Sequence, residues 1–164
     1  MVWEVAGYET VSVSKAMIKV KLLLGTYILQ SNRHKFNRYE VRPDCPLCNS
    51  GEEDREHFIV ICSKLMDVRQ KFIIALKNIL YTSMHHNLCD TIFSDTNTLT
   101  QLILDCTGLV YIPHSLHIPI ENIGRDLLYA LHAARCSFFL KDEWIGECIV
   151  LGVLLDFTTV KLLA

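Results

Sequence analysis

Three cysteines and one histidine lie close together in the segment CPLCNSGEEDREHFIVIC, residues 45–62. The spacing is Cys-x2-Cys, then eight residues to the histidine and four more to the last cysteine. Structural zinc takes four sulfur or nitrogen ligands in a tetrahedron, and a Cys-x2-Cys turn supplies two thiolates from one tight loop. The pattern therefore predicts one structural Zn2+ ion, bound by Cys45, Cys48, His57 and Cys62. Four protein ligands leave no open position for a catalytic water.

The other histidines, cysteines and acids are expected to play no part in that site. A structural zinc site prefers softer ligands than carboxylates, so we expect the acids beside the motif to be solvated: Asp44, Glu52, Glu53 and Asp54. Single cysteines in apolar helical contexts are predicted to be buried in the core: Cys89, Cys106, Cys136 and Cys148. A second site at His85, His86 and Cys89 lacks an obvious fourth ligand. His114 and His117 are expected at the surface.

Basic residues gather just before the motif, with seven Lys/Arg between Lys15 and Arg42 against the single acid Glu40. The run NRHKFNRYEVR interleaves them with aromatic residues. Basic side chains neutralise phosphates, and aromatic faces stack on unpaired bases. The candidate nucleic-acid-binding residues are Lys15, Lys19, Arg33, Lys35, Phe36, Arg38, Tyr39 and Arg42. The alternative interpretation is a solvated helix face followed by a loop.

Composition narrows the class of protein. The chain has 164 residues, of which 51% are apolar and 21% charged, so it is not intrinsically disordered. A net charge of -2 excludes a uniformly basic nucleic-acid coat but not a local basic patch. The N-terminus lacks a signal-peptide pattern, and the apolar stretch 148–155 is too short to span a membrane. We therefore expect a soluble intracellular protein with reduced thiols, in which clustered cysteines favour metal over disulfides.

Helical periodicity predicts the elements that position these residues. Helices are expected over 14–30, 52–62, 63–81, 95–110 and 120–141. In the first of them, one apolar stripe would face inward, with Lys15 and Lys19 on the opposite side; its members are Met17, Val20, Leu24, Tyr27 and Ile28. The inward positions expected in 95–110 are Leu99, Leu102, Ile103 and Cys106. Those expected in 120–141 are Ile123, Leu127, Leu131, Ala134 and Phe138. Strand-like alternation is nowhere sustained, so the fold is predicted to be mostly α: a small helical bundle with a zinc-stapled module. Its parts would be a basic helical segment (1–42), the zinc module and following helix (43–81), C-terminal helices (82–141) and an apolar tail (142–164).

Three stretches of the chain, GTYILQSNRHKFNRY, CPLC and EDREHFIVIC, together resemble a known region. It is the zinc-binding region that follows the reverse transcriptase domain in LINE-type (non-LTR) retrotransposon polyproteins. The flanking segments VWEVAGYET, DVRQKFI and IGRDLLYALHAARCSFFL are similar too. The resemblance covers roughly residues 2–140, is most specific over 24–62, and is weaker over 143–164.

The resemblance implies that the same three cysteines and His57 bind zinc, and that a parent reverse transcriptase domain is a partner. The chain would then be the C-terminal end of a larger protein. Polymerase activity does not transfer, because the chain lacks the Tyr-x-Asp-Asp signature and any Asp-Asp dipeptide. No Gly-rich phosphate loop or nucleophile elbow is present either, and no small-molecule substrate is expected. The predicted function is a non-catalytic accessory domain that contacts template RNA or target DNA.

Two alternatives stay open. The first is a protein-interaction module that docks onto the polymerase or a host protein, which the apolar-rich composition favours. The second is a relic fragment of a mobile element without a function of its own.

Overall fold

The computed structural model describes residues 10–38 and 40–141, and helices make up its architecture. The longer helices are α2 (Thr10–Leu23), α3 (Gln30–Phe36), α4 (Met66–Ser83), α5 (His86–Ser94), α6 (Thr96–Leu104) and α7 (His114–Lys141). Short helical turns are η1 (His57–Ile61), η2 (Ser63–Leu65) and η3 (Cys106–Gly108). Within the described ranges there is no strand, only an isolated bridge between Asp44 and Glu52. The prediction of a mostly helical fold is confirmed.

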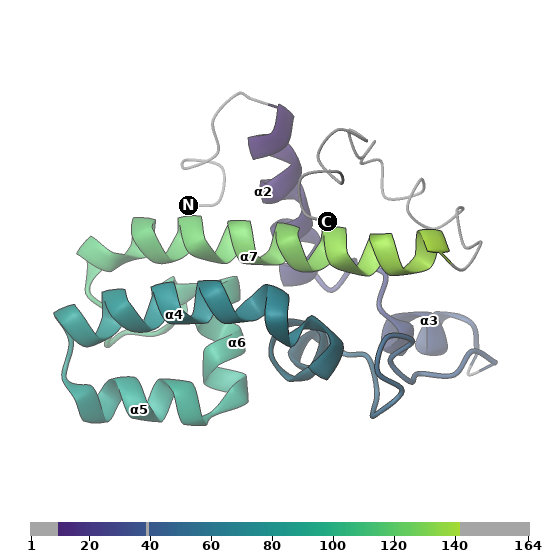
Figure 1. Ribbon diagram of the computed structural model, residues 1–164, viewed down its shortest axis with the longest axis horizontal. Coiled ribbons are helices and arrows are strands. Elements are labelled where there is room, and N and C mark those ends of the chain that lie inside the picture. Colours follow the sequence, from purple (N-terminus) through teal and green to yellow (C-terminus); the bar gives the residue numbers. More distant parts are fainter. Residues whose placement is uncertain (1–9, 39, 142–164) are drawn as a thin grey trace.

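Helix α7 is the long central element, and α2, α4 and α6 all pack against it. Figure 1 shows α4 running beneath α7, α5 folding back beneath α4, and α2 crossing behind α7 at a steep angle. Apolar side chains from these helices form one core, with fully buried members that include Leu22, Leu76, Leu80, Leu102, Leu127 and Leu131. No helix in the described part combines the length and apolar character needed to cross a bilayer.

The first helix differs from the predicted one in its limits and its inward face. It runs from Thr10 to Leu23, and Gly25 then adopts a left-handed conformation with φ +69°, as glycine does after a helix C-terminus. The buried apolar positions include Ala16 and Leu22, whereas Leu24 is 71% exposed. The predicted inward stripe is wrong at Met17 and Leu24, which are exposed, and is confirmed at Tyr27, which is buried.

Lys19 was expected in solvent, and this expectation is wrong. Its side chain is 1% exposed, and its ammonium lies 2.7 Å from a carboxylate oxygen of Glu121 on α7. Burial lowers the pKa of Lys19, and the Glu121 carboxylate opposes that shift. On the same helix, Gly124 permits α7 to pack closely against α6, because a Cβ at Gly124 would lie 2.6 Å from the backbone oxygen of Ile103.

The C-terminal half contains one helix that the periodicity did not indicate, α5, and one that begins earlier than predicted. Helix α7 starts at His114 and includes Pro119. A proline inside a helix removes one hydrogen bond and usually kinks or breaks the helix, but α7 continues through Pro119 to Lys141. His117 is consequently buried, not at the surface. The predicted helix 95–110 ends at Leu104, and Phe139 rather than Phe138 packs inward at the end of α7.

Candidate metal centre

A tight turn brings the first two cysteines to the same side of the loop. The Asn49 N–H donates to the Cys45 carbonyl at 2.8 Å, and the Cys45 N–H donates to the Gly51 carbonyl at 2.7 Å. Asn49 has a φ of +54°, a left-handed conformation that asparagine tolerates better than most residues. These backbone bonds hold the Cys-x2-Cys loop closed.

A short helical segment supplies the other two candidate ligands. It begins at residue 55 rather than at Glu52, whose backbone is bridged to Asp44. The Asp54 carboxylate accepts the N–H of His57 at 2.7 Å. At the other end, the Cys62 N–H donates to the His57 carbonyl at 2.7 Å, which closes a wide π-helical turn.

Arg69 on α4 holds the end of this turn in place. Its guanidinium donates to the Ile59 carbonyl at 2.6 Å and to the Cys62 carbonyl at 3.1 Å. Backbone carbonyls at a helix end have no partner within the helix, so a buried arginine satisfies them. Nothing in the type or spacing of Arg69 marks it in the sequence as a partner of the metal loop.

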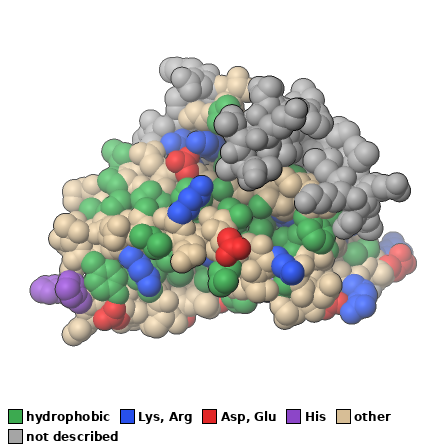
Figure 2. Space-filling view, in the orientation of Figure 1, with side chains coloured by type: hydrophobic (Ala, Val, Ile, Leu, Met, Phe, Trp, Pro, Cys, Tyr) green, Lys and Arg blue, Asp and Glu red, His purple; other side chains and the backbone are tan. Residues whose placement is uncertain are grey.

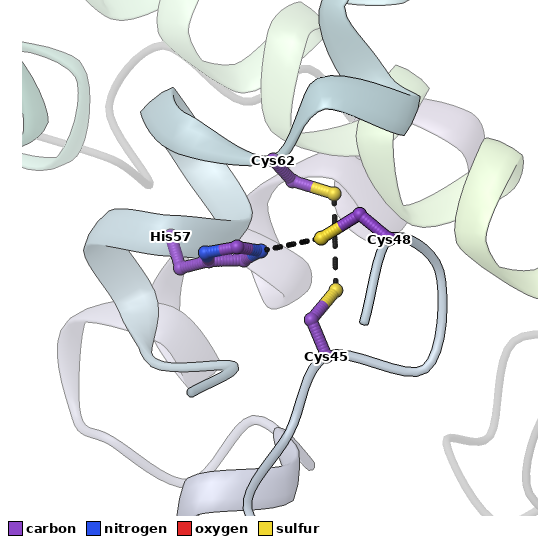
Figure 3. Close-up of side chains that lie close together, drawn as sticks. All are labelled: Cys45, Cys48, His57 and Cys62. Atoms are coloured by element: carbon purple, nitrogen blue, oxygen red, sulfur yellow. Dashed lines mark hydrogen bonds between the residues drawn. The ribbon is translucent and has the colours of Figure 1, made fainter. Parts of the chain in front are cut away.

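The four predicted ligands converge on one point (Figure 3). Their ligand atoms all lie within 4.8 Å of one another, with 3.8 Å between the sulfurs of Cys45 and Cys62 and 3.2 Å from the Cys48 sulfur to His57 Nε2. Two sulfurs bound to one tetrahedral zinc at about 2.3 Å lie about 3.8 Å apart. A disulfide would need about 2.05 Å. The donor set fits a single tetrahedral metal ion, and these residues form a candidate metal-binding site.

The thiols differ in how easily they lose a proton. Burial raises the pKa of Cys45 to about 12 and also raises the pKa of Cys62. Burial works in the same direction on Cys48, but hydrogen bonds from Ser50 and His57 outweigh it and lower its pKa to about 6. Because metals bind thiolates, occupation of this site must release protons from the two buried thiols.

Glu53 was expected to be solvated, and this expectation is wrong. It is 0% exposed, and its carboxylate accepts two hydrogen bonds from Arg135 on α7, at 2.8 and 3.0 Å. The backbone N–H of Gln30, at the start of α3, donates to the same carboxylate at 2.9 Å. Glu53 therefore joins the metal loop to both α3 and α7. Its partner is 82 positions away in the sequence, so no local signal indicated it.

The remaining cysteines follow the prediction as far as they are described. Cys89, Cys106 and Cys136 are buried, and Cys148 lies outside the described residues. Within residues 10–38 and 40–141, Cys45, Cys48, His57 and Cys62 are the one group of metal-ligating side chains close enough to share an ion. His85 and His86 form no second cluster with Cys89 there.

The candidate nucleic-acid residues separate into different surroundings. Lys19 is buried and cannot contact a nucleic acid. The Lys15 ammonium lies 2.7 Å from the Asp126 carboxylate. Tyr39 lies outside the described residues. The exposed members on and after α3 are Lys35, Phe36, Arg38 and Arg42, with Arg33 half-buried among them. On the face in Figure 2, Lys and Arg side chains are scattered among apolar and acidic ones. The candidate residues that remain exposed therefore lie on α3 and the segment after it.

No family model, curated protein or solved structure matches this chain. The support for the metal cluster and the helical fold therefore comes from the sequence and structure of this chain.

Proposed function

We propose that this chain is a non-catalytic zinc-binding accessory module of a LINE-type retrotransposon reverse transcriptase, which contacts template RNA or target DNA. The observation that supports it most is a cluster of three sulfurs and one imidazole nitrogen within 4.8 Å of one another, which follows a helix with an exposed lysine and phenylalanine at its end. The sequence resemblance supplies the parent enzyme class.

Zinc is the metal that this donor set favours. Thiolate and imidazole ligands in a tetrahedron select zinc over the hard cations, which prefer oxygen. Four protein ligands complete the coordination, so the role proposed for the ion is structural. In this role the ion holds residues 45–62 in a fixed position beside α3 and α7, through Glu53 and its hydrogen bonds.

Nucleic-acid contact is supported by the side chains around α3. Lys35 forms no ion pair with any described carboxylate, and Phe36 is 82% exposed. Arg38 follows at the end of the helix and is also exposed. Unpaired cations attract phosphates, and the release of counterions makes such binding depend on salt.

The first prediction tests this contact with the triple variant Arg33→Ala, Lys35→Ala and Arg38→Ala. Binding of the full chain to single-stranded RNA or DNA, measured by fluorescence anisotropy over a salt series, should weaken. The slope of log K against log salt should become shallower by about two to three units, because each lost phosphate contact contributes about 0.7 to 0.9.

A matched variant removes the same charge elsewhere, with Lys64, Lys71 and Lys77 changed to alanine on η2 and α4. It should bind like the unmodified chain. The proposal is wrong if the chain binds no nucleic acid at low salt, or if both triple variants weaken binding equally.

A protein-interaction module is the second candidate, and the turn before α7 favours it. Val110 is 96% exposed, and its neighbour Tyr111 and Ile118 in the first turns of α7 are exposed as well. Apolar side chains grouped in solvent are typical of a surface that meets a partner. A concentration-dependent oligomer that contains no nucleic acid would favour this candidate. Co-purified nucleic acid that high salt removes would favour the first.

A further inference from the structure

Two hollows adjoin at Gly25 and Asn32, on either side of α3. The first has a volume of about 340 Å³ and the second about 510 Å³. Both volumes fall in the range of small-ligand sites. Helical spacing explains the division, because residues three or four apart share one face of a helix.

The smaller hollow is apolar. Arg33 and Phe36 line it from α3, and Tyr27 and Ile28 line it from the preceding segment. The Tyr27 ring is buried and stacked on Phe58, which makes it a rigid wall. Phe36 leaves most of its ring in solvent beside this hollow. An exposed ring next to an apolar hollow offers an unpaired base a face on which to stack.

The larger hollow is polar, and both of its carboxylates already accept hydrogen bonds from the protein. Asp54 accepts the backbone N–H of His57, and Glu56 accepts the Thr96 hydroxyl. Both acids therefore serve the fold.

The cations of the larger hollow are less engaged. Lys35 has no partner among the described residues. Arg55 donates only to backbone carbonyls of α2, at 3.4 Å, and pairs with no described carboxylate. A guanidinium and an ammonium that lack acidic partners fit a phosphate group.

Thr100 supplies an independent observation in the same hollow. The residue is 7% exposed, and its buried hydroxyl has no hydrogen-bond partner within the described part of the chain. An unsatisfied buried hydroxyl costs free energy, so such a group calls for an explanation. A rotation of the side chain that turns the hydroxyl toward the hollow would let an oxygen of a bound ligand satisfy it.

We propose that the two hollows form one binding site for a single nucleic-acid strand, with a base stacked on Phe36 and a neighbouring phosphate held by Lys35, Arg55 and Thr100. This inference rests on the proposed function and names where and how the contact is made. The strand must be single, because a base inside a duplex has no free face for the ring.

The experiment measures anisotropy of the full chain with labelled oligo(dT), oligo(rU), an abasic strand of equal length and a duplex. Phe36→Ala should weaken oligo(dT) or oligo(rU) binding about 5- to 100-fold, the range measured for one stacked base. Phe36→Trp should retain it. On the abasic strand, Phe36→Ala should bind like the unmodified chain, since no base is present to stack. Val110→Ala, an exposed apolar truncation elsewhere, should change nothing.

Thr100→Val tests the phosphate side, because it removes the hydroxyl at nearly constant volume. It should weaken the abasic and the normal strands alike. Lys35→Ala should make the salt slope shallower by about 0.7. The tighter of the two homopolymers identifies the strand as DNA or RNA.

The outcomes separate the site from the function. In one outcome, the unmodified chain binds with salt dependence while Phe36→Ala and Thr100→Val bind with the same affinity. That result overturns this site and leaves the proposed function standing. Equal affinity for duplex and single strand also overturns the site. Absence of any binding by the unmodified chain overturns the proposed function. Circular dichroism and metal content of each variant show that it is folded.

Discussion

At the scale of the residue, the metal cluster combines one easily ionised thiol with two that resist ionisation. Cys48 has a pKa of about 6, because hydrogen bonds outweigh the effect of burial, whereas burial raises that of Cys45 to about 12. Thiolates repel one another in a small buried volume, so a bound cation is what allows all three to be charged. The geometry therefore depends on each ligand.

The variants Cys48→Ala and His57→Ala test this dependence. Each leaves three ligands, so protein purified without added zinc should lose stoichiometric zinc, and residues 43–62 should become sensitive to protease. Metal content by mass spectrometry gives the result. Cys89→Ala, which truncates a buried thiol outside the cluster, should keep one zinc per chain. Retention of one zinc by both ligand variants would rule out the ligand set.

At the scale of the element, a buried ion pair fastens the metal loop to α7. Arg135 donates twice to Glu53, and its guanidinium lies 4.7 Å from the centre of the Phe139 ring. Burial opposes the charge of Arg135, but the hydrogen bonds and charge of Glu53 outweigh it and raise its pKa. Arg135 therefore keeps its charge inside the protein.

Glu53→Gln tests the fastening. It leaves the Arg135 charge buried without its counterion, so the free energy of unfolding should fall by about 3–5 kcal/mol. Urea denaturation followed by circular dichroism measures the change. Asp126→Asn breaks the more exposed pair with Lys15 and should cost about 1 kcal/mol or less. Equal losses in the two variants would contradict the role given to Glu53.

At the scale of the whole molecule, a buried histidine on α7, in contact with the segment between α2 and α3, links stability to pH. His132 Nδ1 lies 2.7 Å from the Tyr27 hydroxyl. Burial, together with the nearby charges of Arg135 and Lys21, lowers the pKa of His132 to about 4. The native state therefore holds this imidazole neutral.

Stability should consequently fall as the pH drops. Above about pH 6.5 the imidazole is neutral in both the native and the unfolded chain; between about 6.5 and 4 the unfolded chain binds the proton more tightly. The loss across that window should reach about 3 kcal/mol. His132→Gln should remove this part of the slope and His114→Gln, at an exposed position, should not. The difference between the unmodified chain and His132→Gln separates this effect from proton competition at the metal ligands, and equal slopes would contradict it.

Local patterns were enough to predict the candidate metal cluster and much of the helical packing. The four ligands lie within residues 45–62, so a turn and one helical segment suffice to bring them together. The inward positions Leu99, Leu102 and Ile103 of α6 were also predicted correctly, because helical periodicity depends only on near neighbours. The first helix ends at Leu23 rather than near residue 30, and Gly25 takes the left-handed conformation that follows its end.

Tertiary structure alone decided which charged residues are buried. Lys19 and Glu53 are of types expected in solvent, and nothing near them in the sequence indicates otherwise. Each is stabilised inside by an opposite charge on α7, Glu121 and Arg135, which lie 102 and 82 positions away. Removing a charge from water is unfavourable unless a partner compensates it, and only the folded chain brings such distant partners into contact.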